Sequence, residues 1–278
     1  MIGSIIGDIA GSIYEFANIK TKDFELFGPE AEFTDDSILT IATADALLAD
    51  DLANVGNYYA DYACTHPHPL GGYGNSFKNW VVRKTRCGHA PAYNSCGNGS
   101  AMRVGPVGWA FATTEETLAA ARKSAECTHN HPEGIKGAQA TALCIFMARH
   151  RASREEIRRS VEATFGYDLT MCLDELRPRY SWQGLDGEGN GETCQDSVPQ
   201  AILCALQADD FEDAIRNAVS IGGDSDTIAC ITGSIAEAVY GIPAALRQKG
   251  LSHLTEDFRR TVMDFEKRFG HGLLPSEK

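Results

Sequence analysis

The sequence lacks the features that would place the protein in a membrane, outside the cell or on a nucleic acid. No apolar run approaches the roughly 20 residues that a membrane-spanning helix needs. The segment from Met1 to Asp8 has no basic residues before its apolar ones and does not read as a signal peptide. The formal net charge of −13 argues against broad binding of nucleic acids or anionic membranes, which needs a basic surface.

Paired cysteine motifs are also missing. The chain has nine cysteines, an odd number, and no two of them form a Cys-x-x-Cys motif. Cys144, Cys204 and Cys230 lie inside apolar helical patterns, where we expect small buried hydrophobic residues. An odd, scattered set of cysteines without a signal peptide predicts the reducing environment of the cytoplasm.

Strand-like alternation is scarce, and no linker rich in Ser, Gly or Pro divides the 278 residues. Helical periodicity predicts helices at 37–48, from 114 onward, and at 136–149, 153–165, 198–207, 211–221, 227–240 and 255–269. Long loops are predicted at 24–33, 64–98 and 180–196, and such loops often line a site. The pattern therefore predicts an all-α fold, a compact orthogonal helical bundle with one domain over residues 1–278.

Two short acidic clusters lie near opposite ends of the chain, each just before a predicted helix. They are Thr34-Asp35-Asp36 and Asp224-Ser225-Asp226-Thr227. Taken singly, each cluster can be a helix cap, because acidic and hydroxyl side chains are favourable at a helix start. Taken together, four neighbouring carboxylates repel one another unless cations are present. Carboxylate and hydroxyl oxygens suit Mg²⁺ or Mn²⁺, whereas zinc would recruit His or Cys.

Two further segments can carry chemistry. The first, residues 7–15, is apolar apart from Asp8 and Glu15, and Glu15 is expected one or two helical turns beyond Asp8. This segment is either a buried first helix or the source of a general acid or base, Glu15. The second, residues 97–103, is a glycine-rich turn whose amides can cradle a phosphate, although many ordinary loops look the same.

Two other metal sites can be read from the sequence. Cys64, His66, Cys127 and His129 could bind zinc, but their spacing matches no established zinc pattern. The segment Asp186-Gly187-Glu188-Gly189-Asn190-Gly191 partly imitates a calcium loop. Its twelfth position is Ser197 rather than glutamate, so an acidic loop is the better interpretation.

Five motifs in order resemble those of the ADP-ribosylglycohydrolase family, which includes the dinitrogenase reductase-activating glycohydrolases. The motifs are Gly-Asp-x-x-Gly-x-x-x-Glu at 7–15, Thr-Asp-Asp at 34–36, Gly-Asn-Gly-Ser-Ala-Met-Arg at 97–103, Thr-His-x-His-Pro at 128–132 and Gly-Gly-Asp-Ser-Asp-Thr at 222–227. The resemblance extends from Gly3 to about Tyr240. It implies an all-α fold with a binuclear Mg²⁺ or Mn²⁺ centre, and a hydrolase that releases ADP-ribose from a protein side chain or small acceptor.

The resemblance also implies roles for individual residues. The metal ligands would be Thr34, Asp35, Asp36, Asp224, Asp226 and Thr227. The catalytic residues would be Glu15 and Asp35, either of which could take a proton from the attacking water. The substrate-binding residues would be Gly97, Asn98, Gly99, Ser100, Met102 and His129.

The segment between Glu15 and Thr34 is brief, whereas in some members of the family it forms a lid over the metals. The expected partners are ADP-ribosylated proteins or small ADP-ribose conjugates, with nucleic acid only as a modified substrate. One alternative is a metal-dependent ADP-ribose or nucleotide binding module without turnover. The other is a structural helical domain whose acidic residues only cap helices.

Overall fold

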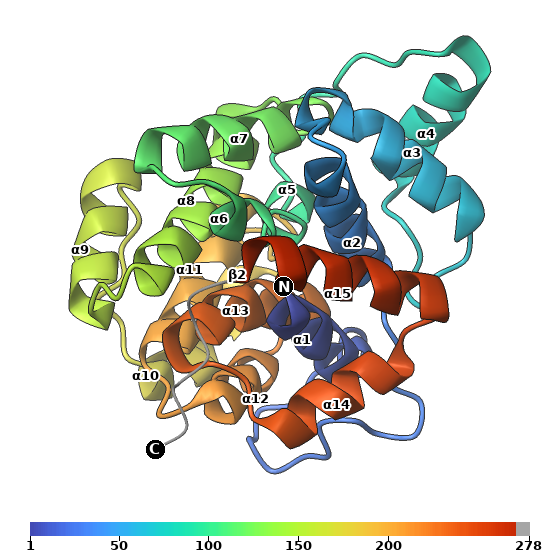
Figure 1. Ribbon diagram of the computed structural model, residues 1–278. Coiled ribbons are helices and arrows are strands. Elements are labelled where there is room, and N and C mark those ends of the chain that lie inside the picture. The colour runs from blue at the N-terminus through green and yellow to red at the C-terminus, as the bar shows by residue number, and fades with distance from the viewer. Residues whose placement is uncertain (271–278) are drawn as a thin grey trace.

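A computed structural model describes residues 1–270. Residues 271–278, the end of the predicted domain, lie outside the described residues. The regular secondary structure of the described chain is almost entirely helical, which confirms the predicted all-α fold (Figure 1). Its helices are α1 (Ile2–Ser12), α2 (Asp35–Leu48), the 3-10 helix η1 (Leu52–Asn54), α3 (Val55–Thr65), α4 (Asn75–Cys87), α5 (Gly99–Met102), α6 (Val107–Ala110), α7 (Thr114–Glu126), α8 (Pro132–Arg149), α9 (Arg154–Phe165), α10 (Leu173–Arg179), α11 (Cys194–Leu206), α12 (Phe211–Ile221), α13 (Ser225–Tyr240), α14 (Ala244–His253) and α15 (Glu256–Phe269).

The first helix and a helix near the end of the chain lie side by side in the core. Figure 1 shows α1 in blue against α13 in orange. Gly3, Gly7 and Gly11 recur every four residues and so form one stripe on α1. A methyl group on Gly7 would lie 1.9 Å from the carbonyl oxygen of Ala229 in α13, so only glycine permits this close approach. The stripe therefore brings the two ends of the chain together.

Local sequence signals explain where several helices begin. Ser153 and Glu156 form a reciprocal capping box at the start of α9. The same arrangement at α7 uses Thr113 and Glu116. Proline occupies the first position of α8, where its missing N–H has no helical partner to lose. These starts agree with the predicted helices within a few residues.

The predicted loop at 64–98 is wrong in its middle, because α4 occupies Asn75–Cys87. Phe77, Trp80 and Val81 are buried at helical spacing and anchor this helix. The Gly, Pro and His residues on both sides of it obscured that signal. The predicted loop at 180–196 also contains structure, namely a two-residue hairpin, β1 (Tyr180–Ser181) with β2 (Gly184–Leu185).

All nine cysteines lie among the described residues and none forms a disulfide, while Cys144, Cys204 and Cys230 are buried as predicted. Within residues 1–270, no helix combines the length and the apolar character needed to cross a membrane.

Candidate metal centre and active site

The two acidic clusters meet at one end of the α1–α13 pair. Thr34 is the N-cap of α2, and its hydroxyl accepts a hydrogen bond from the backbone N–H of Asp36 at 3.2 Å. Asp224 is the N-cap residue of α13, but its side chain makes no capping bond. The hydroxyl of Thr227 donates to Asp36 Oδ2 at 3.2 Å and so joins the clusters directly. One cluster thus caps its helix, and both face a common space.

Asp8 is a further buried carboxylate at this place, and the sequence analysis assigned it no role. Its oxygens accept hydrogen bonds from the backbone N–H groups of Thr34 at 2.9 Å and Ser37 at 3.1 Å. They also accept from the hydroxyls of Thr34, at 2.7 Å, and Ser37. Asp8 therefore holds the start of α2 against α1. A buried aspartate inside an apolar, glycine-striped helix was the signal that pointed to it.

The carboxylates form two overlapping groups. Asp8, Asp36 and Asp226 each offer one oxygen within 4.8 Å of the others, and so do Glu15, Asp224 and Asp226. Asp226 belongs to both groups. Four of these residues are buried, whereas Glu15 is partly exposed, as is Asp35 beside the groups. The site therefore consists of four buried aspartates and two partly exposed carboxylates.

Burial raises the pKa of every carboxylate in this site, and repulsion between carboxylates adds to it at Glu15, Asp35, Asp36 and Asp226. Burial is the largest cause throughout, and it raises the pKa of Asp8 to about 6. The pKa values of Glu15 and Asp35 rise to about 8, with neighbouring aspartates adding to burial. The pKa of Asp36 and that of Asp226 rise well above the usual range for the same reasons. Positive charge in this space would relieve the repulsion.

The donor set fits a hard divalent cation. Asp36 Oδ1 is buried and has no hydrogen-bond partner, an arrangement that is costly unless the oxygen meets a ligand. Both carboxylate groups contain oxygen donors only, which is the preference of Mg²⁺ and Mn²⁺ rather than of zinc. The four residues of the alternative zinc site form no such group within the described residues.

Glu15 lies in this site but not on a helix, which corrects the sequence expectation. α1 ends at Ser12, and beyond it the side-chain amide of Asn18 donates to the carbonyl oxygens of Tyr14 at 2.7 Å and Glu15 at 3.0 Å and closes a turn. The Asn18 side chain also donates to the Gly223 carbonyl oxygen through its NH₂ group and accepts from the Gly223 backbone N–H through its oxygen. This short segment is therefore fastened to the Gly222–Gly223 turn that precedes α13.

Both long loops reach Glu15. The indole N–H of Trp182 donates to the carbonyl oxygen of Glu15 at 3.0 Å, and Phe16 stacks on Trp182 with ring centroids 6.1 Å apart. On another side, a methyl group added to Gly71 would lie 2.8 Å from Glu15 Oε2. Segments from the regions 64–98 and 180–196 therefore border the acidic site, and the exposed ring of Phe16 lies at its edge.

The predicted glycine-rich loop adjoins the second cluster. Asn98 Nδ2 donates to Asp224 Oδ2 at 2.7 Å, and the Asn98 backbone N–H donates to the Glu192 carbonyl at 2.9 Å. The Ser100 hydroxyl donates to the Gly134 carbonyl at 2.6 Å, and the side chains of Ser100 and Met102 are buried. A ligand at this loop would therefore meet Gly97, Gly99 and the backbone more readily than those two side chains.

His129 is buried directly behind this loop. A methyl group on Gly99 would lie 3.1 Å from His129 Nε2, and one on Gly97 would lie 3.6 Å from the same atom. Burial, followed by the positive charge of Arg103, holds the pKa of His129 well below its usual value. The imidazole is therefore neutral at physiological pH.

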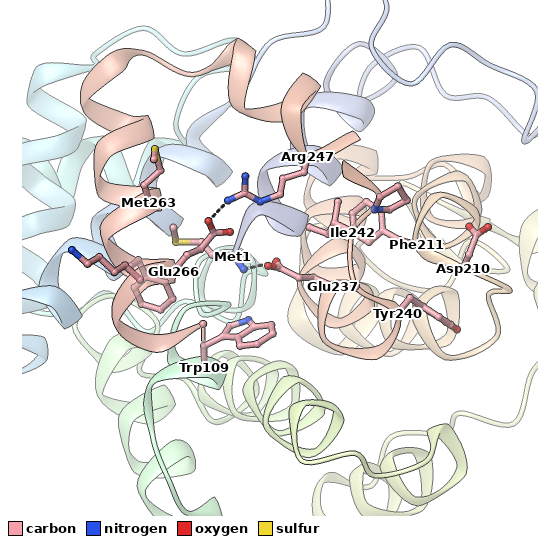
Figure 2. Close-up of a pocket in the computed structure, with 15 residues that line it drawn as sticks. Met1, Trp109, Asp210, Phe211, Glu237, Tyr240, Ile242, Arg247, Met263 and Glu266 are labelled. Atoms are coloured by element: carbon pink, nitrogen blue, oxygen red, sulfur yellow. Dashed lines mark hydrogen bonds and ion pairs between the residues drawn. The ribbon is translucent and has the colours of Figure 1, made fainter. Parts of the chain in front are cut away.

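A large cavity of about 760 Å³ lies at the other end of α1 and α13 (Figure 2). Its walls are mainly apolar and include Trp109, Phe211 and Tyr240. Figure 2 shows the ammonium group of Met1 paired with Glu237 at this cavity. None of the predicted site residues lines it. The acidic cluster, about 20 Å away along α13, is therefore the candidate for chemistry.

Comparison with known proteins identifies the family and the fold. A sequence model described as ADP-ribosylglycohydrolase matches residues 1–273. The chain is 28% identical over 311 aligned residues to the ADP-ribosylhydrolase ARH3 of Mus musculus. The alignment covers 87% of this chain and 83% of that protein. It is 24% identical over 278 residues to the ADP-ribosylarginine hydrolase Tri1 of Pseudomonas putida (strain GB-1), with 87% and 70% covered. A solved chain titled "ADP-ribosylglycohydrolase-related protein complex" shares the fold, with a TM-score of 0.68, 22% identity and 96% of each chain covered.

Proposed function

The chain belongs to the ADP-ribosylglycohydrolase family, whose members are hydrolases of glycosyl bonds, and we propose that it cleaves the bond between the distal ribose of ADP-ribose and an acceptor group. The acceptor is a protein side chain or a small molecule. The observation that carries the proposal is the meeting of both acidic clusters, Glu15 and the Gly97–Ser100 loop at one place. The similarity to an ADP-ribosylhydrolase and to an ADP-ribosylarginine hydrolase supports the substrate class.

We propose that the cations are Mg²⁺ or Mn²⁺, held by Thr34, Asp35, Asp36, Asp224, Asp226 and Thr227. The unpartnered Oδ1 of Asp36 and the all-oxygen donor set support this assignment. Such cations, when bound, would supply the positive charge that orients ribose hydroxyls and makes a water molecule easier to ionise. Asp8 would act indirectly by holding Thr34 and the start of α2 in place.

The reaction itself needs a base beside the anomeric carbon. The oxygen of a water molecule forms a bond to that carbon, while the glycosidic bond breaks through an oxocarbenium-like state. Glu15 takes the proton of the water, and Asp35 is the alternative base; both are partly exposed. The acceptor leaves with the bonding electrons. A guanidinium leaves with little help, whereas a serine oxygen must also gain a proton.

A panel of substrates tests the proposed function. ADP-ribose joined to arginine, to serine, to a nucleobase or to a small acyl group would be incubated with the protein, and free ADP-ribose would be measured. Release from at least one linkage supports the proposal. Tight binding of ADP-ribose without release from any linkage would instead identify a binding module.

Gly71 offers a sharp test of how Glu15 is placed. Gly71 has a φ of +72°, and Gly88 has a φ of +73° with nothing within 4 Å of an added methyl group. We expect Ala at either position to cost roughly 1–2 kcal/mol of stability, because both backbones are left-handed. Only Gly71→Ala should also slow ADP-ribose release, by roughly ten- to a hundred-fold, since it displaces the Glu15 carboxylate.

Thermal unfolding and initial rates measured side by side check this prediction. Gly88→Ala is the matched control for backbone strain without contact to Glu15. Equal rates in the two variants would show that the position of Glu15 does not matter for the reaction.

A further inference from the structure

Arg103 is a buried cation without an acidic partner. Its side chain is 1% exposed, and it forms no ion pair with any carboxylate among residues 1–270. Its guanidinium lies 4.0 Å from the centre of the Tyr59 ring, and its Nε has no hydrogen-bond partner. An unpaired buried charge costs several kcal/mol. Such a cost suggests that the charge has a use beyond packing.

Within the described residues, the side chain of Arg103 makes one hydrogen bond, and this bond connects it to His129 through Thr128. Arg103 Nη2 donates to Thr128 Oγ1 at 2.6 Å, and Thr128 Oγ1 lies 2.8 Å from His129 Nδ1. Thr128 itself is completely buried. The three residues therefore form a continuous chain that begins at a cation and ends at the imidazole.

The direction of the second bond follows from the proton on Thr128. The guanidinium can only donate, so the Thr128 oxygen accepts from it and keeps one proton to give. The Ala125 carbonyl is 3.5 Å away and already accepts the backbone N–H groups of Thr128 at 3.1 Å and His129 at 2.8 Å. His129 Nδ1, at 2.8 Å, is the better acceptor. Nδ1 then carries no proton, and the proton of the neutral ring is on Nε2.

We propose that Arg103 and Thr128 are positioning residues that fix His129 as an Nε2–H donor toward the Gly97–Gly99 loop, where it meets the ADP-ribose unit. The position of Nε2 behind Gly97 and Gly99 gives this donor its direction. The ligand in this inference rests on the proposed function. The positive charge of Arg103 has a second effect, because together with burial it lowers the pKa of His129 and keeps the ring neutral.

The test is the tautomer of His129, measured by long-range ¹H–¹⁵N correlation NMR on ¹⁵N-labelled protein. The His129 signals are assigned by their loss in His129→Asn. We expect the Nε2–H form in the wild type, and a mixture with the Nδ1–H form in Thr128→Val, which keeps the shape but removes the hydroxyl. Thr128→Ser restores the hydroxyl and should restore the Nε2–H form.

The second measurement is the affinity of each variant for ADP-ribose, determined by calorimetry. Thr128→Val should weaken binding about tenfold, as expected for the loss of one well-directed hydrogen bond, while Thr128→Ser should recover most of it. Thr141→Val is the matched control, since Thr141 is also fully buried but donates only to the Gly137 carbonyl at 3.0 Å. It should change neither the tautomer nor the affinity.

The outcomes separate this inference from the proposed function. An Nδ1–H ring in the wild type, or a tautomer unchanged in Thr128→Val, would overturn the inference whatever the enzyme hydrolyses. A changed tautomer with unchanged ADP-ribose affinity would overturn the positioning role. The predicted changes in both, with no release of ADP-ribose from any linkage, would support the inference and count against hydrolysis alone.

Discussion

Replacing Asp226 by asparagine should lower the rate of ADP-ribose release by on the order of 10³-fold, because Asp226 is the carboxylate common to both groups. Its Oδ1 accepts the backbone N–H of Thr227 at 2.9 Å, and an asparagine oxygen can accept the same bond. The local backbone is thus preserved. One of several mutually repelling charges is removed, so the metal-free variant should melt at the same temperature as the wild type or a few degrees higher.

Initial rates of the protein with added cation, and melting curves of the chelator-treated protein, check this prediction. Asp45→Asn is a matched control, because Asp45 lies on α2 outside the acidic groups and accepts a hydrogen bond from the Tyr62 hydroxyl at 3.1 Å. It should leave the rate nearly unchanged. If folded Asp226→Asn keeps more than about a tenth of the wild-type rate, the cluster does not have the proposed role.

Replacing Glu15 by glutamine should lower kcat by roughly 10²- to 10⁴-fold, the usual contribution of a general base. Glutamine keeps the size of the side chain but cannot take the proton of the water. The turn that holds Glu15 uses backbone atoms, bonded to Asn18 and Trp182, so it should survive the change. KM should change much less than kcat, because the Gly97–Ser100 loop and His129 are untouched.

Steady-state kinetics with the best substrate of the panel decides between two bases. Glu25→Gln is the control, since Glu25 is exposed and lies on the same segment. If Glu15→Gln retains its kcat while Asp35→Asn loses activity but still binds Mn²⁺, Asp35 rather than Glu15 takes the proton. Full activity in both variants would contradict the proposed mechanism.

Much of the site could be predicted because its residues stand in short, dense motifs. Thr34-Asp35-Asp36 and the cluster at 224–227 carry more acid than helix caps need, and the structure brings them together. Residues 97–103 adjoin the second cluster through Asn98, and His129 lies behind this loop. Their individual roles stay predictions, as do the cytoplasmic location and the single domain.

The remaining parts of the site depend on tertiary contacts that no local pattern reveals. Asp8 reaches Thr34 and Ser37 because α1 packs against the start of α2 as well as against α13. Gly71 lies beside Glu15 through a loop closure that leaves no trace in nearby residues. Arg103 reads as an ordinary basic residue until its burial and its bond to Thr128 are seen.

For the fold, too, some elements could be predicted from the sequence and others could not. Helices with strong caps or clear periodicity, such as α9 and α12, were predicted nearly to the residue. α4 was missed because its three buried anchors lie within a segment whose Gly, Pro and His content favours a loop. Composition outweighed periodicity in that interpretation, although the periodicity was correct.

The central claim is that carboxylates from both ends of the chain form one divalent-cation site on which hydrolysis depends. The most direct measurement is the rate of ADP-ribose release by chelator-stripped protein as Mn²⁺ or Mg²⁺ is added back. We predict almost no release from the stripped protein, recovery to the original rate with added cation, and no recovery in Asp226→Asn. An undiminished rate from protein verified to be free of metal would contradict the account.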